Sequence, residues 1–317
     1  METIKLMNDR NVVLMPRCTL RVDKILKQWA EEWNETLETC TEKWELSDIC
    51  LMGGGDVALL FRWSILEYVG NINDRVRSRI VCNMYRVIVF NIDGSFKGQY
   101  RFRLQAGYAS HVYFIDGALY ASIYANDGDN CTLLHMWPGS NDSAQKRMGK
   151  YSSSRAIGPD GRIYASCGGH DAVDEGEMWP VIAVYEDKKL KPLLKTDSFQ
   201  GLRKIRLGED GRIYGVTSDG KEGLVFDGEK ADRFKLPVER GIDMAPANDG
   251  AALYIVTGAD GKGCDCYRVP RDGNGDICQK LAIECGDEII GHFNYCVIGD
   301  GIGAAYAGVT IYMFDLV

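Results

Sequence analysis

The sequence predicts an all-β chain of the β-propeller class, folded as one domain over residues 1–317. The first observation is an internal repeat, in which an apolar strand meets an Asp-Gly turn and an alternating strand follows. The second is the interval between these turns, about 40 to 60 residues, which suits a four-stranded blade better than a helical repeat. The third is a weaker hairpin after each repeat, which would supply two outer strands.

The clearest copies of the repeat are RAIGPDGRIYASC (155–167), KIRLGEDGRIYGVT (204–217) and MAPANDGAALYIVT (244–257). The Asp-Gly pair supplies the backbone freedom that a tight hairpin turn needs. The aspartates that mark the six predicted turns are Asp56, Asp116, Asp160, Asp210, Asp249 and Asp300. The predicted outer hairpins span residues 85–104, 131–148, 181–194, 223–236 and 266–283, and residues 64–82 form an insertion.

The last blade contains too few strands. After its first hairpin only TIYMFDLV (310–317) remains, which is enough for one strand. A closed propeller pairs every edge, so we expect an N-terminal strand within residues 1–16 to complete the last blade. Either IKLM or NVVLMP can take this role, and residues 47–317 then form six blades.

Seven blades are the alternative. Residues 3–16 align with KIRLGEDGRIYGVT and could open a seventh unit around Asp9. However, the apolar residues within positions 22–33 recur at helical spacing, where that unit would need outer strands. We therefore prefer six blades, with a short helical insertion near residues 21–40.

The turns of the DGRIY type resemble those of the NHL-like and gluconolactonase-like six-bladed propellers, whose inner hairpins often read Asp-Gly-x-apolar-aromatic. The resemblance covers most of residues 47–317 and implies a propeller fold. The gluconolactonase-like group also implies an alternative function, a metal-dependent hydrolase or lactonase. Asp243 and Asn294 are the inner-strand candidates for holding its divalent metal, but that family normally needs a further channel carboxylate, which we do not identify.

The composition indicates which classes of binding partner and which cellular compartment to expect. The net charge of -8 argues against general nucleic-acid binding, which needs concentrated positive charge. Neither a membrane-spanning segment nor a secretory signal is evident. The 11 cysteines are odd in number and scattered, as expected of free thiols in a reducing compartment. We expect a cytoplasmic monomer that binds neither nucleic acid nor membranes.

Two groups of residues are candidates for binding. The loops opposite the marker turns are acidic, and the long one at residues 168–180 ranks first for contact with a protein or peptide partner. Polar residues at the start of the inner strands would line a central channel. Together the candidate binding residues are His111, Arg155, His170, Asp171, Asp174, Glu175, Trp179, Lys204, Asp243, His292 and Asn294.

Sequence motifs for metal binding or catalysis are weak. Cys264 and Cys266 form a C-x-C pair without a second cysteine pair, which is a poor zinc signal. Residues 272–284 resemble half of a calcium loop, but Ile277 stands where glycine is expected. We identify no nucleophile motif, no metal ligand set and no cofactor. The sequence therefore favours a non-catalytic binding scaffold and leaves catalysis open.

Overall fold

The computed structural model describes the chain apart from short gaps. Those gaps are residues 1–3, 9–10, 35–43, 53–54, 73–74, 106, 116, 125–130, 138–144, 148–151, 158–161, 168–178, 187–188, 197–200, 260–262, 272–277 and 300. The chain is all-β except for one described helix, and it divides into two compact units. Unit 1 comprises Met1–Leu20 and Met148–Val317, and unit 2 comprises Arg21–Arg147.

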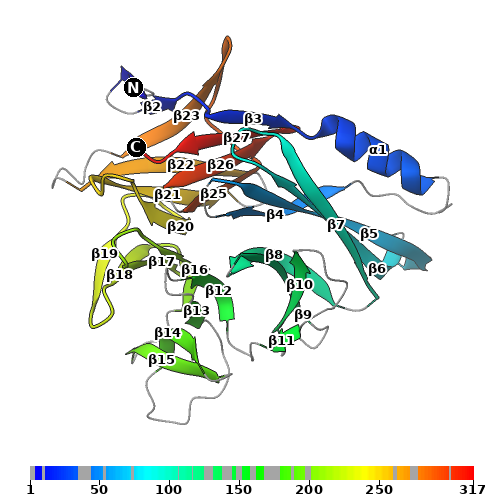
Figure 1. The fold of residues 1–317 in the computed structure, drawn as a ribbon, viewed down its shortest axis with the longest axis horizontal. Coiled ribbons are helices and arrows are strands. Elements are labelled where there is room, and N and C mark those ends of the chain that lie inside the picture. Colours follow the sequence, from blue (N-terminus) through cyan, green and yellow to red (C-terminus); the bar gives the residue numbers. More distant parts are fainter. Residues whose placement is uncertain are drawn as a thin grey trace. The chain divides into compact units, whose positions relative to one another are not determined.

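Unit 2 contains two four-stranded sheets, each built from consecutive strands (Figure 1). The first consists of β4 (Glu45–Leu51), β5 (Val57–Ile72), β6 (Arg75–Phe90) and β7 (Phe96–Leu104). The second consists of β8 (Tyr108–Ile115), β9 (Ala118–Tyr124), β10 (Cys131–Trp137) and β11 (Gln145–Arg147). The predicted insertion at residues 64–82 belongs to the long β5–β6 hairpin.

A single helix, α1 (Asp23–Asn34), confirms the predicted helical insertion near residues 21–40. Its residue Trp29 is buried and meets the rings of Trp44 and Phe61 edge-on, at centroid distances of 5.3 and 5.8 Å. The guanidinium of Arg86, on β6, lies 4.6 Å from the centre of the Trp29 ring. Aromatic packing and this cation–π contact therefore stabilise the position of α1 against the first sheet of unit 2.

Unit 1 contains four sheets. One is formed by β12 (Ser152–Ile157), β13 (Ile163–Cys167), β14 (Trp179–Glu186) and β15 (Lys189–Thr196). The next is formed by β16 (Leu202–Leu207), β17 (Ile213–Thr217), β18 (Glu222–Phe226) and β19 (Ala231–Lys235). A larger sheet contains β20 (Gly241–Pro246), β21 (Ala252–Ala259), β22 (Gly263–Pro270), β23 (Gln279–Cys285) and β24 (Glu288–Ile290). The last is formed by β25 (Tyr295–Gly299), β26 (Ile302–Ala307) and β27 (Thr310–Asp315), together with an N-terminal strand.

The N-terminal strands correct one expectation. The segments IKLM and NVVLMP lie in β1 (Ile4–Asn8) and β2 (Asn11–Leu14), but they extend the larger sheet, where β2 runs parallel to β23. The strand that pairs with β27 is instead β3 (Cys18–Arg21), as the adjacent blue and red arrows in Figure 1 show. The reason is burial, because Val12 and Leu14 contribute to the core of the larger sheet. The described strands β1 and β2 therefore do not open a seventh sheet.

The Asp-Gly turns at Asp210 and Asp249 are confirmed as the turns of inner hairpins. The glycines that follow the marker aspartates have positive φ angles, for example 74° at Gly211 and 69° at Gly250. Residues with a Cβ atom are strained at such positive φ angles, whereas glycine is not. The aspartates also close the turns, since Asp210 and Asp249 accept hydrogen bonds from the backbone N–H two residues later, at 3.1 and 2.8 Å. Asp116, Asp160 and Asp300 lie outside the described residues.

Consecutive four-stranded sheets in chain order are a β-propeller arrangement, so the predicted fold class is confirmed. Within each unit the cores lie between neighbouring sheets, as between β17 and β18 and the strands β20 to β22. The number of blades in a ring remains a prediction. No described helix is both long and apolar enough to span a bilayer.

Replacing Trp29 with Ala tests how the helix is held. Because the change removes a fully packed aromatic ring, we expect the free energy of unfolding to fall by about 3–5 kcal/mol. The measurement is urea denaturation followed by circular dichroism. Lys24→Ala changes an exposed side chain of the same helix and should have little effect. Equal stabilities of the two variants would contradict this packing.

Candidate functional site

A sheet's first strand in the chain is called here an inner strand where it packs against the first strand of another sheet of the same unit. In unit 1, β12 contacts β16, β16 contacts β20, and β20 contacts β25, while in unit 2 β4 contacts β8. Side chains that alternate along these strands point either into the cores or to the opposite face. Several of the latter are polar.

In unit 2 the polar pair is Asp48 and His111. Asp48, on β4, is buried, and its carboxylate accepts a hydrogen bond of 2.9 Å from the backbone N–H of Val112. The same oxygen lies 3.5 Å from Nδ1 of His111, on β8. The carboxylate therefore orients a partly exposed imidazole. The predicted residue His111 was recognised from the sequence, but its partner Asp48 was not.

In unit 1 the predicted residue Asp243 is fully buried on β20 and forms an ion pair with Arg206 of β16. The guanidinium donates from Nε at 3.0 Å and from a terminal nitrogen at 2.6 Å, and the N–H of Met244 adds a third bond at 3.0 Å. Such a bidentate pair satisfies a buried carboxylate. Asp243 thus binds the chain's own arginine.

Lys204 lies two residues before Arg206 on β16 and is half-buried. Its ammonium donates a long hydrogen bond of 3.4 Å to the hydroxyl of Tyr295, on β25. The same nitrogen lies 5.3 Å from the centre of the Tyr295 ring, which is cation–π geometry. Arg206 also reaches β25, because its side chain lies 3.4 Å from the position that a Cβ on Gly299 would take. We call Lys204, Arg206, Asp243 and Tyr295 the inner polar cluster.

His292 and Asn294 precede β25 and do not join this cluster. Both are exposed. Nδ1 of His292 lies 2.8 Å from the carboxylate of Asp265, on β22, and Lys280 is 3.0 Å from the same oxygen. Burial acts to raise the pKa of Asp265, but the hydrogen bonds from His292 and Lys280 outweigh it and lower that pKa.

The side chain of Asn294 binds the backbone of the turn at Gly308. Its side-chain oxygen accepts a hydrogen bond of 2.8 Å from the N–H of Gly308. The oxygen that a metal would need is therefore already used, and Asp243 is used by Arg206. Among the described residues, no group of three or more His, Cys, Asp or Glu side chains is arranged to hold a metal ion.

For the remaining predicted site residues, the structure describes at most the backbone. His170, Asp171, Asp174 and Glu175 of the acidic loop lie outside the described residues. Arg155 is placed on β12 and Trp179 at the start of β14, without a description of their side chains. The expected loop site therefore remains a prediction.

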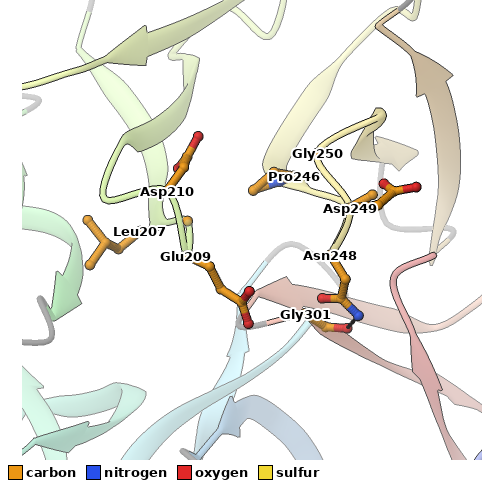
Figure 2. A pocket seen from close by; sticks show the side chains of 10 residues that line it. Leu207, Glu209, Asp210, Pro246, Asn248, Asp249, Gly250 and Gly301 are labelled. Atoms are coloured by element: carbon orange, nitrogen blue, oxygen red, sulfur yellow. Dashed lines mark hydrogen bonds between the residues drawn. The ribbon is translucent and has the colours of Figure 1, made fainter.

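A pocket that the sequence analysis missed lies at the inner hairpin turns of three sheets in unit 1. Its cavity volume is about 190 Å³, and Leu207, Pro246 and Ala247 give it apolar walls. Figure 2 shows Glu209 and Asp210 on one side and Asn248 and Asp249 on the other. We call this the turn pocket. The Asp-Gly motif was the available signal, but its use as a hairpin marker did not reveal that the turns meet.

The turn pocket has fixed and unpaired acidic groups. The hydroxyl of Tyr214 donates a bond of 2.6 Å to Asp210, and Asn248 donates one of 3.0 Å to the carbonyl oxygen of Gly301. Glu209 and Asp249 are exposed, and neither forms an ion pair with a described residue. Two carboxylates without an ion-pair partner among the described residues therefore line a pocket that also has apolar lining residues.

Comparison with known proteins gives likenesses of fold only. No protein-family model matches the chain, and no curated protein matches it. Among solved structures, YCF48 bound to a D1 peptide is 11% identical, with 88% of this chain and 80% of that one covered and a TM-score of 0.46. A catalytically inactive virginiamycin B lyase from Staphylococcus aureus with quinupristin is 13% identical, with 86% and 85% covered and a TM-score of 0.43.

A putative 6-phosphogluconolactonase from Bacteroides uniformis is 12% identical, with 84% of this chain and 79% of that one covered and a TM-score of 0.44. The resemblance to gluconolactonase-like propellers stated from the DGRIY turns thus recurs among the solved structures. At these values the likenesses carry no argument about activity or partners. Any function has to be argued from the residues of this chain.

Breaking the Arg206–Asp243 pair is predicted to be costly. Asp243→Asn leaves a cation partly buried without its counter-charge, and we expect the free energy of unfolding to fall by about 3–5 kcal/mol. Removing both charges with Arg206→Met and Asp243→Leu should recover most of that loss. Urea denaturation measures both variants, with Asp232→Asn on β19 as an exposed control. A loss in the double variant as large as that of Asp243→Asn alone would contradict the pairing.

The Asp265 contacts predict a pH dependence. The carboxylate's pKa is lower in the folded chain than its unfolded value of about 3.9, so ionised Asp265 stabilises the fold above that pH. The stabilisation is lost as the pH falls through the folded pKa. The stability difference between the wild type and Asp265→Asn should therefore shrink below about pH 4. Urea midpoints across the acid range test this, and a difference unchanged by pH would contradict it.

Proposed function

We propose that the chain is a non-catalytic binding scaffold for a protein or peptide partner. The observation that supports this most directly is the turn pocket, which Glu209 and Asp249 line together with apolar residues and where neither forms an ion pair with a described residue. A lysine or arginine side chain has the matching chemistry, since its aliphatic stem covers apolar surface while its charged end meets carboxylates. The net charge of -8 would add long-range attraction for a basic partner.

We also propose the finer features of the fold and of the partner surface. Six sheets, each opened by a hairpin, favour six blades, with β3 as the fourth strand of the last one. The acidic loop at residues 168–180 is proposed as a second contact surface for the same basic partner. We further propose that the chain acts in the cytoplasm as a monomer and binds neither nucleic acid nor membranes.

The metal-dependent hydrolase or lactonase is not favoured. Its two candidate ligands, Asp243 and Asn294, do not fit the role, because Arg206 and the N–H of Gly308 bind their side-chain oxygens. Replacing the arginine by a metal would leave Arg206 without its counter-charge. The two candidate ligands, both among the described residues, thus give this reaction no support.

The test is selection of peptides from a random displayed library on the purified chain. We expect the selected peptides to contain lysine or arginine beside an apolar residue. Their affinity should fall by about tenfold in the double variant Glu209→Gln, Asp249→Asn, which removes two partly exposed ion pairs. The matched control is Glu229→Gln, Asp232→Asn, which removes the same charge from exposed positions at the β18–β19 hairpin.

Two outcomes would count against the turn pocket. One is a selection without preference for basic residues. The other is an equal loss of affinity in both double variants, which would indicate a general effect of net charge. Neutralising Asp171, Asp174 and Glu175 together tests the loop surface separately, because this change leaves the turn pocket intact.

A further inference from the structure

A second pocket in unit 1 lies next to the turn pocket, and we call it the side pocket. Its cavity volume is about 170 Å³, and its lining residues come from the sheet of β12 to β15 and from the sheet of β16 to β19. The two pockets share the hairpin turn between β16 and β17. Glu209 and Asp210 line the turn pocket, whereas Gly211, the next residue, lines the side pocket. The pockets therefore lie on either side of one turn.

The side pocket has mainly apolar walls. Val184, Ile213 and Phe226 line it and are buried. Leu193, on β15, also lines it but is 43% exposed, so a partner that covers this side chain would remove apolar surface from water. A cavity of about 150 Å³ holds a group of the size of benzene. The side pocket thus has room for one apolar side chain.

The two pockets differ in charge. In the side pocket, the one carboxylate among the described lining residues belongs to Glu186, which lies 3.0 Å from the ammonium of Lys191 and 4.0 Å from Nε of Arg162. Two nearby cations offset the attraction of this carboxylate for a third. In the turn pocket, Glu209 and Asp249 form no ion pair with a described residue. A basic side chain therefore fits the turn pocket, and an apolar side chain fits the side pocket.

A short peptide can reach both pockets. The first strand β16 contacts β12 of one neighbouring sheet and β20 of another, and the two pockets lie towards these two neighbours. Neighbouring sheets pack about 10 Å apart, which is about the length of three extended residues. The turn between the pockets is exposed from Glu209 to Gly211. At Gly211 and Gly228 a Cβ would meet no atom within 4 Å beyond its chain neighbours, so these positions leave the side pocket open.

We propose that one extended peptide occupies both pockets, with a lysine or arginine in the turn pocket and an apolar side chain about three positions away in the side pocket. This inference rests on the proposed scaffold function and adds the second half of the motif that the partner carries. One side chain in one small pocket binds weakly. Two linked side chains bind more tightly, because the second contact forms within the same complex.

The experiment is an NMR titration of the full chain with ¹³C-labelled Ile, Leu and Val methyl groups. The methyl groups of Leu207 report on the turn pocket, and those of Leu193 and Ile213 report on the side pocket. The probe is a glycine–serine peptide, blocked at both ends, with one lysine and a leucine three positions away on each side. Control peptides carry serine in place of the lysine or of both leucines. We expect the probe to shift both sets of methyl groups and to bind at least tenfold more tightly than either control.

A variant of the side pocket separates this inference from the proposed function. Leu193→Asp places a charge in the apolar wall and should weaken binding of the probe by about tenfold, without weakening binding of the peptide that has only lysine. Ile289→Asp, at another exposed apolar residue of unit 1, is the matched control and should leave both affinities unchanged.

The pattern of shifts decides which statement fails. If the Leu207 methyl groups shift while those of Leu193 and Ile213 do not, the turn pocket stands and the two-pocket proposal is overturned. Equal affinities of the probe and the lysine-only peptide overturn it as well. If neither set shifts, the proposed function fails together with this inference.

Discussion

The structure depends on a constraint of β-sheet chemistry, that the unpaired backbone edge of a strand must find a partner. The sheet of β25, β26 and β27 has only three strands from the C-terminal part of the chain, and β3 supplies the fourth from residues 18–21. The backbone N–H of Arg17 donates a bond of 2.7 Å to the carbonyl oxygen of Met313 at this junction. Two segments nearly 300 residues apart are therefore tied to one sheet. In the preceding hairpin of β1 and β2, β2 pairs in parallel with β23, and Val12 and Leu14 are buried in the core of that sheet.

Within unit 1, the first strands of neighbouring sheets pack side by side, and this brings polar groups from distant repeats together. Arg206 and Asp243 are 37 residues apart in sequence, and Lys204 and Tyr295 are 91 residues apart. Each buried charge is costly unless it is paired, so most of these groups meet a partner within the chain. The turn pocket differs in that Glu209 and Asp249 form no ion pair with a described residue, and there a basic partner would have most to offer.

Local features of the fold could be predicted from the sequence, whereas pairings between distant segments could not. Asp-Gly turns can be recognised because glycine adopts the positive φ angles found at Gly211 and Gly250 more readily than other residues. The choice of β3 over NVVLMP as the partner of β27 was missed, because both segments are short and have apolar residues, and only tertiary packing decides between them. In the same way, Asp243 was recognised as unusual within a strand, but its partner Arg206 was not, since no local pattern links them. The turn pocket arises from three turns that each look ordinary alone.

The pairing of β3 with β27 is the central claim, and hydrogen exchange measured by mass spectrometry tests it most directly. In the intact chain, the amides of residues 17–21 should exchange as slowly as those of β26 and β27. Deleting residues 1–21 should then accelerate exchange in residues 310–315, because their outer edge becomes exposed to water. The account is contradicted if residues 17–21 exchange at the rate of an unfolded peptide while residues 310–315 stay protected.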